Sequence, residues 1–212
     1  MTYNFEKEFV NAVENTQKLG YKIDFSGFNH SRYFNNQDQI IALFNEINNT
    51  LQKVAKIKYP PLMKDRGIAL SIIANCGPFH HFIKPIVEDY FNCESYITLG
   101  YISLGNDKYF HRIDLDVLKK ALQEKQFPKQ HHIWLTLESG EIFDLTFGIT
   151  YRSVNDPNFD KELDDGVPLS PVMKHPSELV EGMQYHPIAI EEEIIKASGY
   201  SLDKLSNILY TV

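Results

Sequence analysis

The sequence predicts an α+β fold in which N-terminal helices pack on an antiparallel sheet. Apolar residues recur at helical spacing over residues 4–19 and 37–58, so each segment predicts an amphipathic helix. Residues 95–104 and 133–137 are instead rich in β-branched and aromatic side chains with a period of two, which is typical of strands. Ser139-Gly140 follows the second of these strands and supplies tight-turn chemistry, so a β-hairpin is expected there.

The first half of the chain is expected to be mostly helical. Gly20 ends the first helix, and an irregular aromatic segment over residues 21–36 leads to the second, for which Asn35 or Asn36 is the cap. Tyr59-Pro60-Pro61 ends that second helix, because proline lacks the backbone donor. Apolar spacing predicts a third helix over residues 62–75 and a fourth over residues 80–92, which contains Pro85.

Further elements surround the hairpin. Asp114 caps an expected helix over residues 114–126, and residues 141–147 are expected to form the return strand of the hairpin. The composition then changes, because five prolines and acidic runs fall within residues 155–187. We therefore divide the chain into a helical and sheet core over residues 1–154 and an extended proline-rich segment over residues 155–212. That segment is expected to pack on the same domain, as a possible lid, and to end in a helix at residues 202–210 with Ser201 as its cap.

Composition narrows the class of protein. The 212 residues suit one domain, and 43% hydrophobic with 23% charged residues is ordinary for a soluble protein. A net charge of −7 argues against a nucleic-acid partner. Two cysteines are too few for a disulfide scaffold, and neither a signal peptide nor an apolar stretch of membrane-spanning length is present. We therefore expect a cytoplasmic protein with no membrane partner; the oligomeric state is left open.

The open end of the hairpin carries two polar residues that suit catalysis. His132 begins the first strand and Asp144 lies in the second, so a tight hairpin is expected to bring their side chains near each other. His131 should point to the opposite face, because successive strand residues alternate. A histidine oriented by a carboxylate needs a third group to activate, and Cys76 lies upstream in Ile73-Ala74-Asn75-Cys76-Gly77-Pro78-Phe79.

These residues, in this order, resemble a known family. A cysteine near a helix start, a strand with Gly100-Tyr101, the motif His132-x-Trp134-Leu135 and the motif Asp144-x-Thr146 are similar to the core of transglutaminase-like proteins, which belong with the papain-like cysteine hydrolases. The resemblance covers residues 70–150. It implies a papain-like core and a catalytic triad in which Cys76 is the nucleophile, His132 the general base and then acid, and Asp144 the orienting carboxylate.

The implied function is a cysteine-dependent acyl-transfer enzyme: an amide or thioester hydrolase, protease, deamidase or transglutaminase-like enzyme. Its partner would be a peptide, protein or small amide substrate, and no cofactor is expected. Trp134 shares a strand face with His132, as a core residue or as a wall of the site, and Asn75 is the amide nearest to the cysteine; both are predicted substrate-binding residues.

Three alternatives stay open at this point. Cys76-Gly77-Pro78 also suits the end of a preceding helix, which would place the cysteine at a negative helix end. Papain-like enzymes usually carry a glutamine ahead of the cysteine, and residues 67–75 contain none, which favours a catalytically inactive binding or regulatory module. A zinc site is the third alternative, since Cys76 and His80 are four residues apart and His111 or His132 would supply further ligands. No Cys-x-x-Cys pair is present and Gly77-Pro78 disturbs the helical spacing, so no metal is expected.

Overall fold

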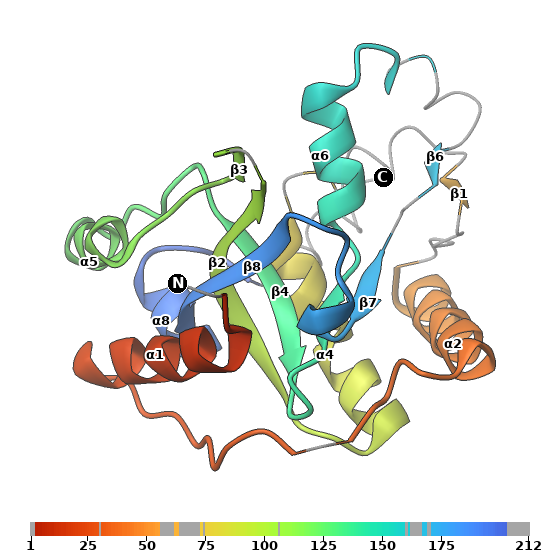
Figure 1. Ribbon diagram of the computed structural model, residues 1–212, viewed down its shortest axis with the longest axis horizontal. Coiled ribbons are helices and arrows are strands. Elements are labelled where there is room, and N and C mark those ends of the chain that lie inside the picture. Colours follow the sequence, from red (N-terminus) through yellow and green to blue (C-terminus); the bar gives the residue numbers. More distant parts are fainter. Residues whose placement is uncertain are drawn as a thin grey trace.

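The structure is a computed structural model that describes residues 3–29, 31–55, 62–63, 73, 75–105, 107–159, 161, 167–168 and 171–202. Its centre is a six-stranded sheet in which every pair of strands is antiparallel (Figure 1). The strands are β2 (Ser95–Leu104), β3 (Tyr109–Phe110), β4 (His132–Leu137), β5 (Ile142–Asp144), β7 (Val172–Lys174) and β8 (Met183–Ile190). Helices and an antiparallel sheet confirm the predicted α+β class.

Strand β2 is the axis of this sheet. Strand β8 pairs along one edge of β2, over residues 98–104. The other edge is shared, because β4 pairs with residues 95–100 and β3 with residues 102–103. Strands β5 and β7 then follow β4 in turn. A separate two-stranded sheet joins β1 (Leu62–Met63) to β6 (Val167–Pro168).

Helices cover both faces of the sheet. They are α1 (Phe5–Lys18), α2 (Gln37–Ala55), α4 (Cys76–Phe91), α5 (Leu115–Glu124), α6 (Phe147–Asn155) and α8 (Glu192–Ala197), with a 3-10 turn, η1 (Pro176–Glu178). Helix α1 packs on β8, and α4 packs on β4 and β2 (Figure 1). The buried apolar residues form two clusters, and alternate residues of β4 belong to each. Ile133 and Leu135 pack in the cluster that contains α4, whereas Trp134 packs in the cluster that contains α1. Because successive strand residues face opposite ways, the two clusters lie on opposite sides of the sheet.

The expected caps Asn36 and Asp114 are confirmed, and Asn4, which was not predicted, also caps a helix. Asn4 Oδ1 accepts from the Lys7 N–H at 3.0 Å, Asn36 Oδ1 from the Asp38 N–H at 2.9 Å, and Asp114 Oδ1 from the Val117 N–H at 2.9 Å. Each side chain satisfies one of the backbone donors that a helix leaves unpaired at its start. These three helix starts are therefore specified by local sequence.

The irregular segment before α2 is held by a buried carboxylate in the hairpin turn. Glu141 accepts hydrogen bonds from the backbone N–H groups of Tyr33 and Phe34, at 2.8 and 3.2 Å. The Ser139 hydroxyl donates to the same carboxylate at 2.8 Å, and the Asn29 N–H donates to the Glu138 carbonyl at 2.8 Å. The irregular segment between α1 and α2 is thus hydrogen-bonded to the turn between β4 and β5.

Several predicted elements differ in the structure. Leu62 and Met63 form a strand instead of opening a helix, and α4 begins at Cys76, four residues before the expected start. The return strand of the hairpin ends at Asp144, because Phe147 begins α6. The rest of the predicted third helix (64–72 and 74), the end of the second (56–58) and most of the predicted C-terminal helix (203–210) lie outside the described residues.

The proline-rich segment is the largest correction. It was expected to be extended and aperiodic, yet β7 within it pairs with β5, and β8 pairs with β2 at the centre of the sheet. Pro187 is tolerated because it sits opposite Gly100, where the pairing register shifts. A side chain at position 100 would place its Cβ 2.1 Å from the His186 carbonyl oxygen and 2.7 Å from Trp134, so glycine is required there.

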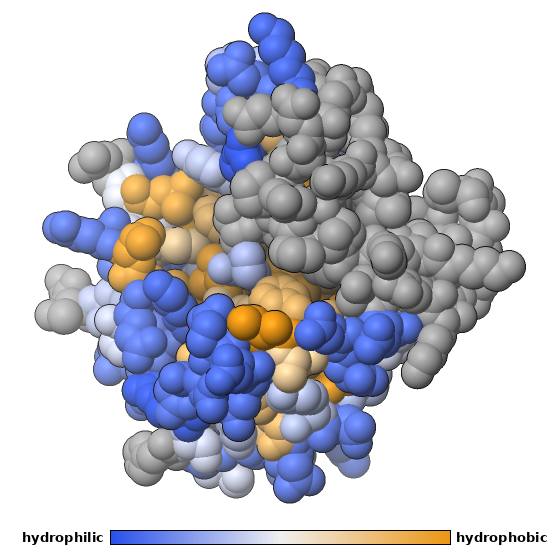
Figure 2. Space-filling view, turned by 90° about the vertical axis from the view of Figure 1, so that its right-hand side faces the viewer, coloured by the Kyte–Doolittle hydropathy of each residue, from blue (hydrophilic) through white to orange (hydrophobic). Residues whose placement is uncertain are grey.

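No helix among the described residues is long and apolar enough to cross a membrane. On the side of the molecule where α2 lies, patches of apolar residues are bordered by hydrophilic side chains (Figure 2). The cytoplasmic location stays a prediction.

Candidate active site

The structure brings the three predicted catalytic residues together at one end of the sheet. Cys76 is the first residue of α4, His132 the first residue of β4, and Asp144 the last residue of β5. Each side chain therefore projects where a regular element begins or ends, which lets elements on both faces of the sheet contribute to one cluster. The three residues are 5%, 1% and 0% exposed, respectively.

His132 and Asp144 form a short, buried hydrogen bond. His132 Nε2 lies 2.6 Å from Asp144 Oδ2, and because an ionised carboxylate only accepts, Nε2 is the donor. This fixes the orientation of the ring and leaves Nδ1 for its hydrogen bond with the Cys76 thiol. Burial lowers the pKa of His132, but the Asp144 charge outweighs burial, and together with the contact to Cys76 it raises the pKa of His132 well above its usual value.

Asp144 is held in its ionised form by five hydrogen bonds. Besides His132, the Tyr185 hydroxyl donates at 2.9 Å, the Thr146 N–H and hydroxyl at 2.9 and 3.2 Å, and the Phe147 N–H at 3.0 Å. Burial raises the pKa of this carboxyl, yet the His132 charge and these bonds hold it well below its usual range. The two backbone donors belong to Thr146, the N-cap of α6, and to Phe147, its first residue, so Asp144 also fixes the chain where that helix begins.

Cys76 lies at the positive end of a helix. Its position at the start of α4 rules out the alternative in which Cys76-Gly77-Pro78 ends a helix; Pro78 is accommodated because the first turn lacks intrahelical partners for its N–H groups. Burial raises the pKa of the thiol, but hydrogen bonds and charge from His131 and His132 outweigh it and bring the pKa below that of a free thiol. The arrangement favours a thiolate.

His131 is a site residue that strand alternation did not predict. It precedes β4 and so does not follow the alternation of that strand. Its Nδ1 lies 2.7 Å from the Pro128 carbonyl oxygen, and its ring shares the Cys76 thiol with His132. The neighbouring pair His131-His132 was the available signal, but the sequence pattern assigned only one of the two to the site.

His80 joins two parts of the site. Its Nδ1 lies 2.8 Å from the Cys76 carbonyl oxygen, and its Nε2 accepts from the Leu145 N–H at 3.1 Å. Burial, more than any other influence, lowers the pKa of His80 to about 4, so the ring is neutral at pH 7 although Asp144 Oδ1 is only 3.6 Å from Nε2. Because both ring nitrogens are engaged by the backbone, His80 is not available as the zinc ligand considered above.

The described residues contain no group of three or more His, Cys, Asp or Glu side chains placed to hold a metal ion. His111, the other alternative ligand, lies near the two histidines of the site: burial, and then the charges of His132 and His131, lower the pKa of His111 to about 4. The second cysteine, Cys93, is free and half-buried; burial raises the pKa of its thiol to about 12.

Tyr200 closes the site over the nucleophile. An ideal Cβ at Gly77 would lie 2.4 Å from Tyr200 Cε1, so the tyrosine ring rests directly on the backbone next to Cys76. The ring also packs on Phe127, at a centroid distance of 4.4 Å, and on His131, at 4.9 Å. Burial raises the pKa of Tyr200 most, and the negative charge of Cys76 raises it further. A hydrogen bond with the Gly77 backbone acts in the opposite direction. No signal in the sequence pointed to this residue.

The two predicted substrate-binding residues have different outcomes. Trp134 is fully buried, stacks beside His132 at a centroid distance of 5.9 Å and donates from Nε1 to the Thr136 hydroxyl at 3.0 Å. It belongs to the core that supports His132, because no part of it is exposed for a substrate to contact. Asn75 occupies the cap position of α4 and its side chain lies 3.4 Å from the Ile73 carbonyl oxygen; its contact with substrate stays a prediction.

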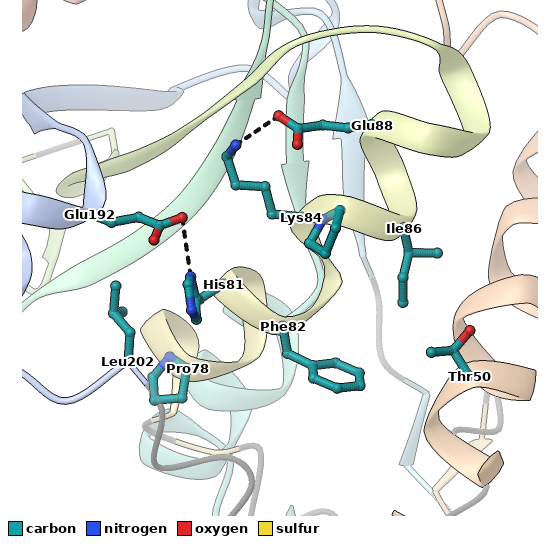
Figure 3. Close-up of a pocket in the computed structure, with 10 residues that line it drawn as sticks. Thr50, Pro78, His81, Phe82, Lys84, Ile86, Glu88, Glu192 and Leu202 are labelled. Carbon is teal, nitrogen blue, oxygen red and sulfur yellow. Dashed lines mark hydrogen bonds and ion pairs between the residues drawn. The ribbon is translucent and has the colours of Figure 1, made fainter. Parts of the chain in front are cut away.

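A cavity of about 580 Å³ lies elsewhere, on the outer side of α4 (Figure 3). Its lining is crossed by two ion pairs, His81 with Glu192 at 3.1 Å and Lys84 with Glu88 at 2.7 Å. Neither Cys76, His132 nor Asp144 lines it. The buried cluster around Cys76, and not this cavity, is the candidate site, because the nucleophile and the proton acceptors are there.

Comparisons with protein-family models, with curated proteins and with solved structures find no match to this chain, so the candidate site stands on its own residues and geometry.

Proposed function

We propose that this protein is a cysteine-dependent acyl-transfer enzyme with a transglutaminase-like, papain-like core, acting on an amide or thioester bond of a peptide, protein or small amide. One observation carries the proposal: a thiol at the start of a helix contacts an imidazole whose other nitrogen is bound to a buried, ionised carboxylate. This is the chemistry that a thiol nucleophile requires.

The geometry supports a two-stage reaction. The Cys76 thiolate attacks the carbonyl carbon of the substrate, and the carbonyl π electrons move to oxygen. The leaving nitrogen or sulfur then takes a proton from an imidazolium beside the sulfur as its bond to carbon breaks, which leaves an acyl thioester on Cys76. Water or an amine completes hydrolysis or transfer. Asp144 holds His132 in the productive orientation throughout.

The oxyanion is best stabilised by backbone donors. The first N–H groups of a helix have no intrahelical partner, so those at Cys76 and Gly77 are the natural candidates for binding the oxyanion. The Tyr200 hydroxyl bonds with the Gly77 backbone in this structure, so this tyrosine has to move before the Gly77 N–H can serve a substrate. The backbone N–H groups would thus bind the oxyanion in place of the glutamine side chain that papain-like enzymes usually carry.

The second candidate is a catalytically inactive binding or regulatory module on the same core. The nearly complete burial of the three residues favours it, because a closed cluster can serve structure alone.

Acylation distinguishes the two. The protein, with Cys93 replaced by serine so that Cys76 is its one thiol, is incubated with a small activated thioester at neutral pH and its intact mass is followed. We expect one acyl group per chain, lost in Cys76→Ser and strongly slowed in His132→Asn. Absence of an acyl adduct both in this protein and in its Tyr200→Ala variant, in which the nucleophile is uncovered, would refute the enzyme and favour the module.

A further inference from the structure

The two imidazoles at Cys76 are in different chemical states. Asp144 is buried and ionised, and a buried carboxylate is stable only when a cation or several donors compensate its charge. His132, at 2.6 Å, supplies the cation, whereas His80 on the other side of Asp144 is neutral. A fully protonated imidazolium has two N–H donors and no acceptor. His132 can therefore stabilise the Cys76 thiolate but has no lone pair with which to take the thiol proton.

His131 has the opposite character. Its Nδ1 is 2.7 Å from the Pro128 carbonyl oxygen, which only accepts, so Nδ1 carries a proton and Nε2 is the one ring nitrogen that can present a lone pair. Within the described part of the chain, Nε2 is buried and has no hydrogen-bond partner. The ring lies beside the Cys76 thiol, on which it acts through both hydrogen bonding and charge. A buried acceptor beside a thiol is the place for the thiol proton to go.

Building on the proposed function, we infer that His131 is a further catalytic residue: its Nε2 takes the Cys76 thiol proton and later gives it to the leaving group, while His132 stays protonated against Asp144. In the first step the S–H bond breaks, its electron pair remains on sulfur, and an N–H bond forms at His131 Nε2. In the later step the bond from the acyl carbon to the leaving nitrogen or sulfur breaks, and the leaving atom takes that proton. This reassigns both proton transfers, which the family resemblance gives to His132.

The assignment makes the resting cluster neutral overall. Before the transfer, Asp144 carries the one negative charge and His132 the one positive charge; after it, Cys76 and His131 add a second opposite pair. A transfer from Cys76 to His131 leaves the total charge unchanged, which matters in a site shielded from water. A purely structural His131 would need only its bond to Pro128 and its edge contacts with the rings of Phe127, at 4.6 Å, and Tyr200.

The test follows the protonation of each ring by NMR of protein labelled with ¹⁵N-histidine, between pH 4 and pH 10. We expect His132 to remain an imidazolium through neutral pH, and the Nε2 signal of His131 to change in Cys76→Ser, because its proton partner is lost. A His132 signal that responds to Cys76→Ser while that of His131 does not would overturn the inference. This comparison needs no substitution at either histidine.

A second measurement uses the ultraviolet absorbance of the thiolate, taken as the difference from Cys76→Ser. His131→Asn, whose amide can still donate to the Pro128 carbonyl, should raise the thiol midpoint by about one pH unit, a tenfold fall in the thiolate-to-thiol ratio. Phe127→Leu, which changes the packing beside His131 but no proton acceptor, should leave the midpoint in place. If His132→Asn raises the midpoint and His131→Asn does not, only this inference fails. If neither substitution changes it, the proposed function fails as well.

Discussion

Replacing Asp144 with asparagine tests the electrostatic core of the site. The asparagine oxygen can keep the bonds from the Thr146 and Phe147 N–H groups, which now reach the carboxylate at 2.9 and 3.0 Å. Its amide nitrogen then faces His132 and offers N–H groups where the carboxylate offered a lone pair. His132 Nε2 has to become an acceptor, so the ring loses its cationic form and its orientation is no longer fixed.

The expected magnitude follows from the charge that is lost. An opposite charge in direct contact shifts a pKa by about 1 to 3 units, or about 1.4 to 4 kcal/mol. We expect the pKa of His132 to fall by this amount in Asp144→Asn and the thiol midpoint of Cys76 to rise. The rate of acylation by an activated thioester should fall by roughly a thousandfold or more, because both the thiolate and the imidazolium are lost together.

Thiolate absorbance against pH and intact-mass acylation rates measure these effects. Tyr185→Phe is the matched control, since it removes one of the five hydrogen bonds to Asp144 at 2.9 Å but keeps the charge; its thiol midpoint should stay close to that of the wild type. The reasoning is wrong if Asp144→Asn and the wild type show the same thiol midpoint, or if Tyr185→Phe shifts it as strongly as Asp144→Asn does.

Four further outcomes are expected. Because the pKa of Asp144 is depressed in the folded state, its contribution to stability is present above its unfolded pKa of about 3.9 and is lost as the pH falls toward the folded value; urea unfolding at a series of pH values should show this loss in the wild type and not in Asp144→Asn. Tyr200→Ala should speed alkylation of Cys76 several-fold while Tyr200→Phe, which keeps the covering ring, should not; equal rates in the two would contradict a covering role. Glu141→Ala removes the acceptor of the part-buried Tyr33 and Phe34 N–H groups and of the buried Ser139 hydroxyl, and should cost about 3 kcal/mol in urea unfolding, against little change for the exposed Glu14→Ala. Gly100→Ala should cost about 3 kcal/mol or more, because its Cβ meets the His186 carbonyl; a variant as stable as the wild type would show that β2 and β8 can separate there.

Local patterns in the sequence predicted the elements whose chemistry is local. Asn36 and Asp114 cap helices because a short polar side chain can reach only the next few backbone donors, and the period-two alternation of residues 95–104 depends on no distant partner. The pairing of His132 with Asp144 followed in the same way from a tight turn of a few residues between two strands.

What the sequence did not predict depends on tertiary contacts. The return strand stops at Asp144, whose side chain accepts from the Thr146 and Phe147 N–H groups where α6 begins. Residues 183–186 of β8 were not predicted as a strand because they lie among prolines, although an antiparallel strand tolerates Pro187 where the register shifts opposite Gly100. Tyr200 reaches Gly77 from more than a hundred residues away, and no periodicity encodes such a contact.

His80 gives the site a built-in acid limit. The neutral imidazole of His80 bonds to the Cys76 carbonyl at the start of α4 and to the Leu145 amide, which follows Asp144 in the chain. It therefore holds the nucleophile Cys76 and the carboxylate Asp144 in a fixed relative position. Because burial depresses the pKa of His80, the folded state disfavours its protonated form, and the stability it contributes is complete above its unfolded value of about 6.5 and declines as the pH falls toward 4. Protonation would turn the nitrogen that accepts from Leu145 into a donor and set its proton against the Leu145 amide proton. Mild acid should therefore separate α4 from the β5–α6 corner, and disassemble the site, before the rest of the sheet unfolds.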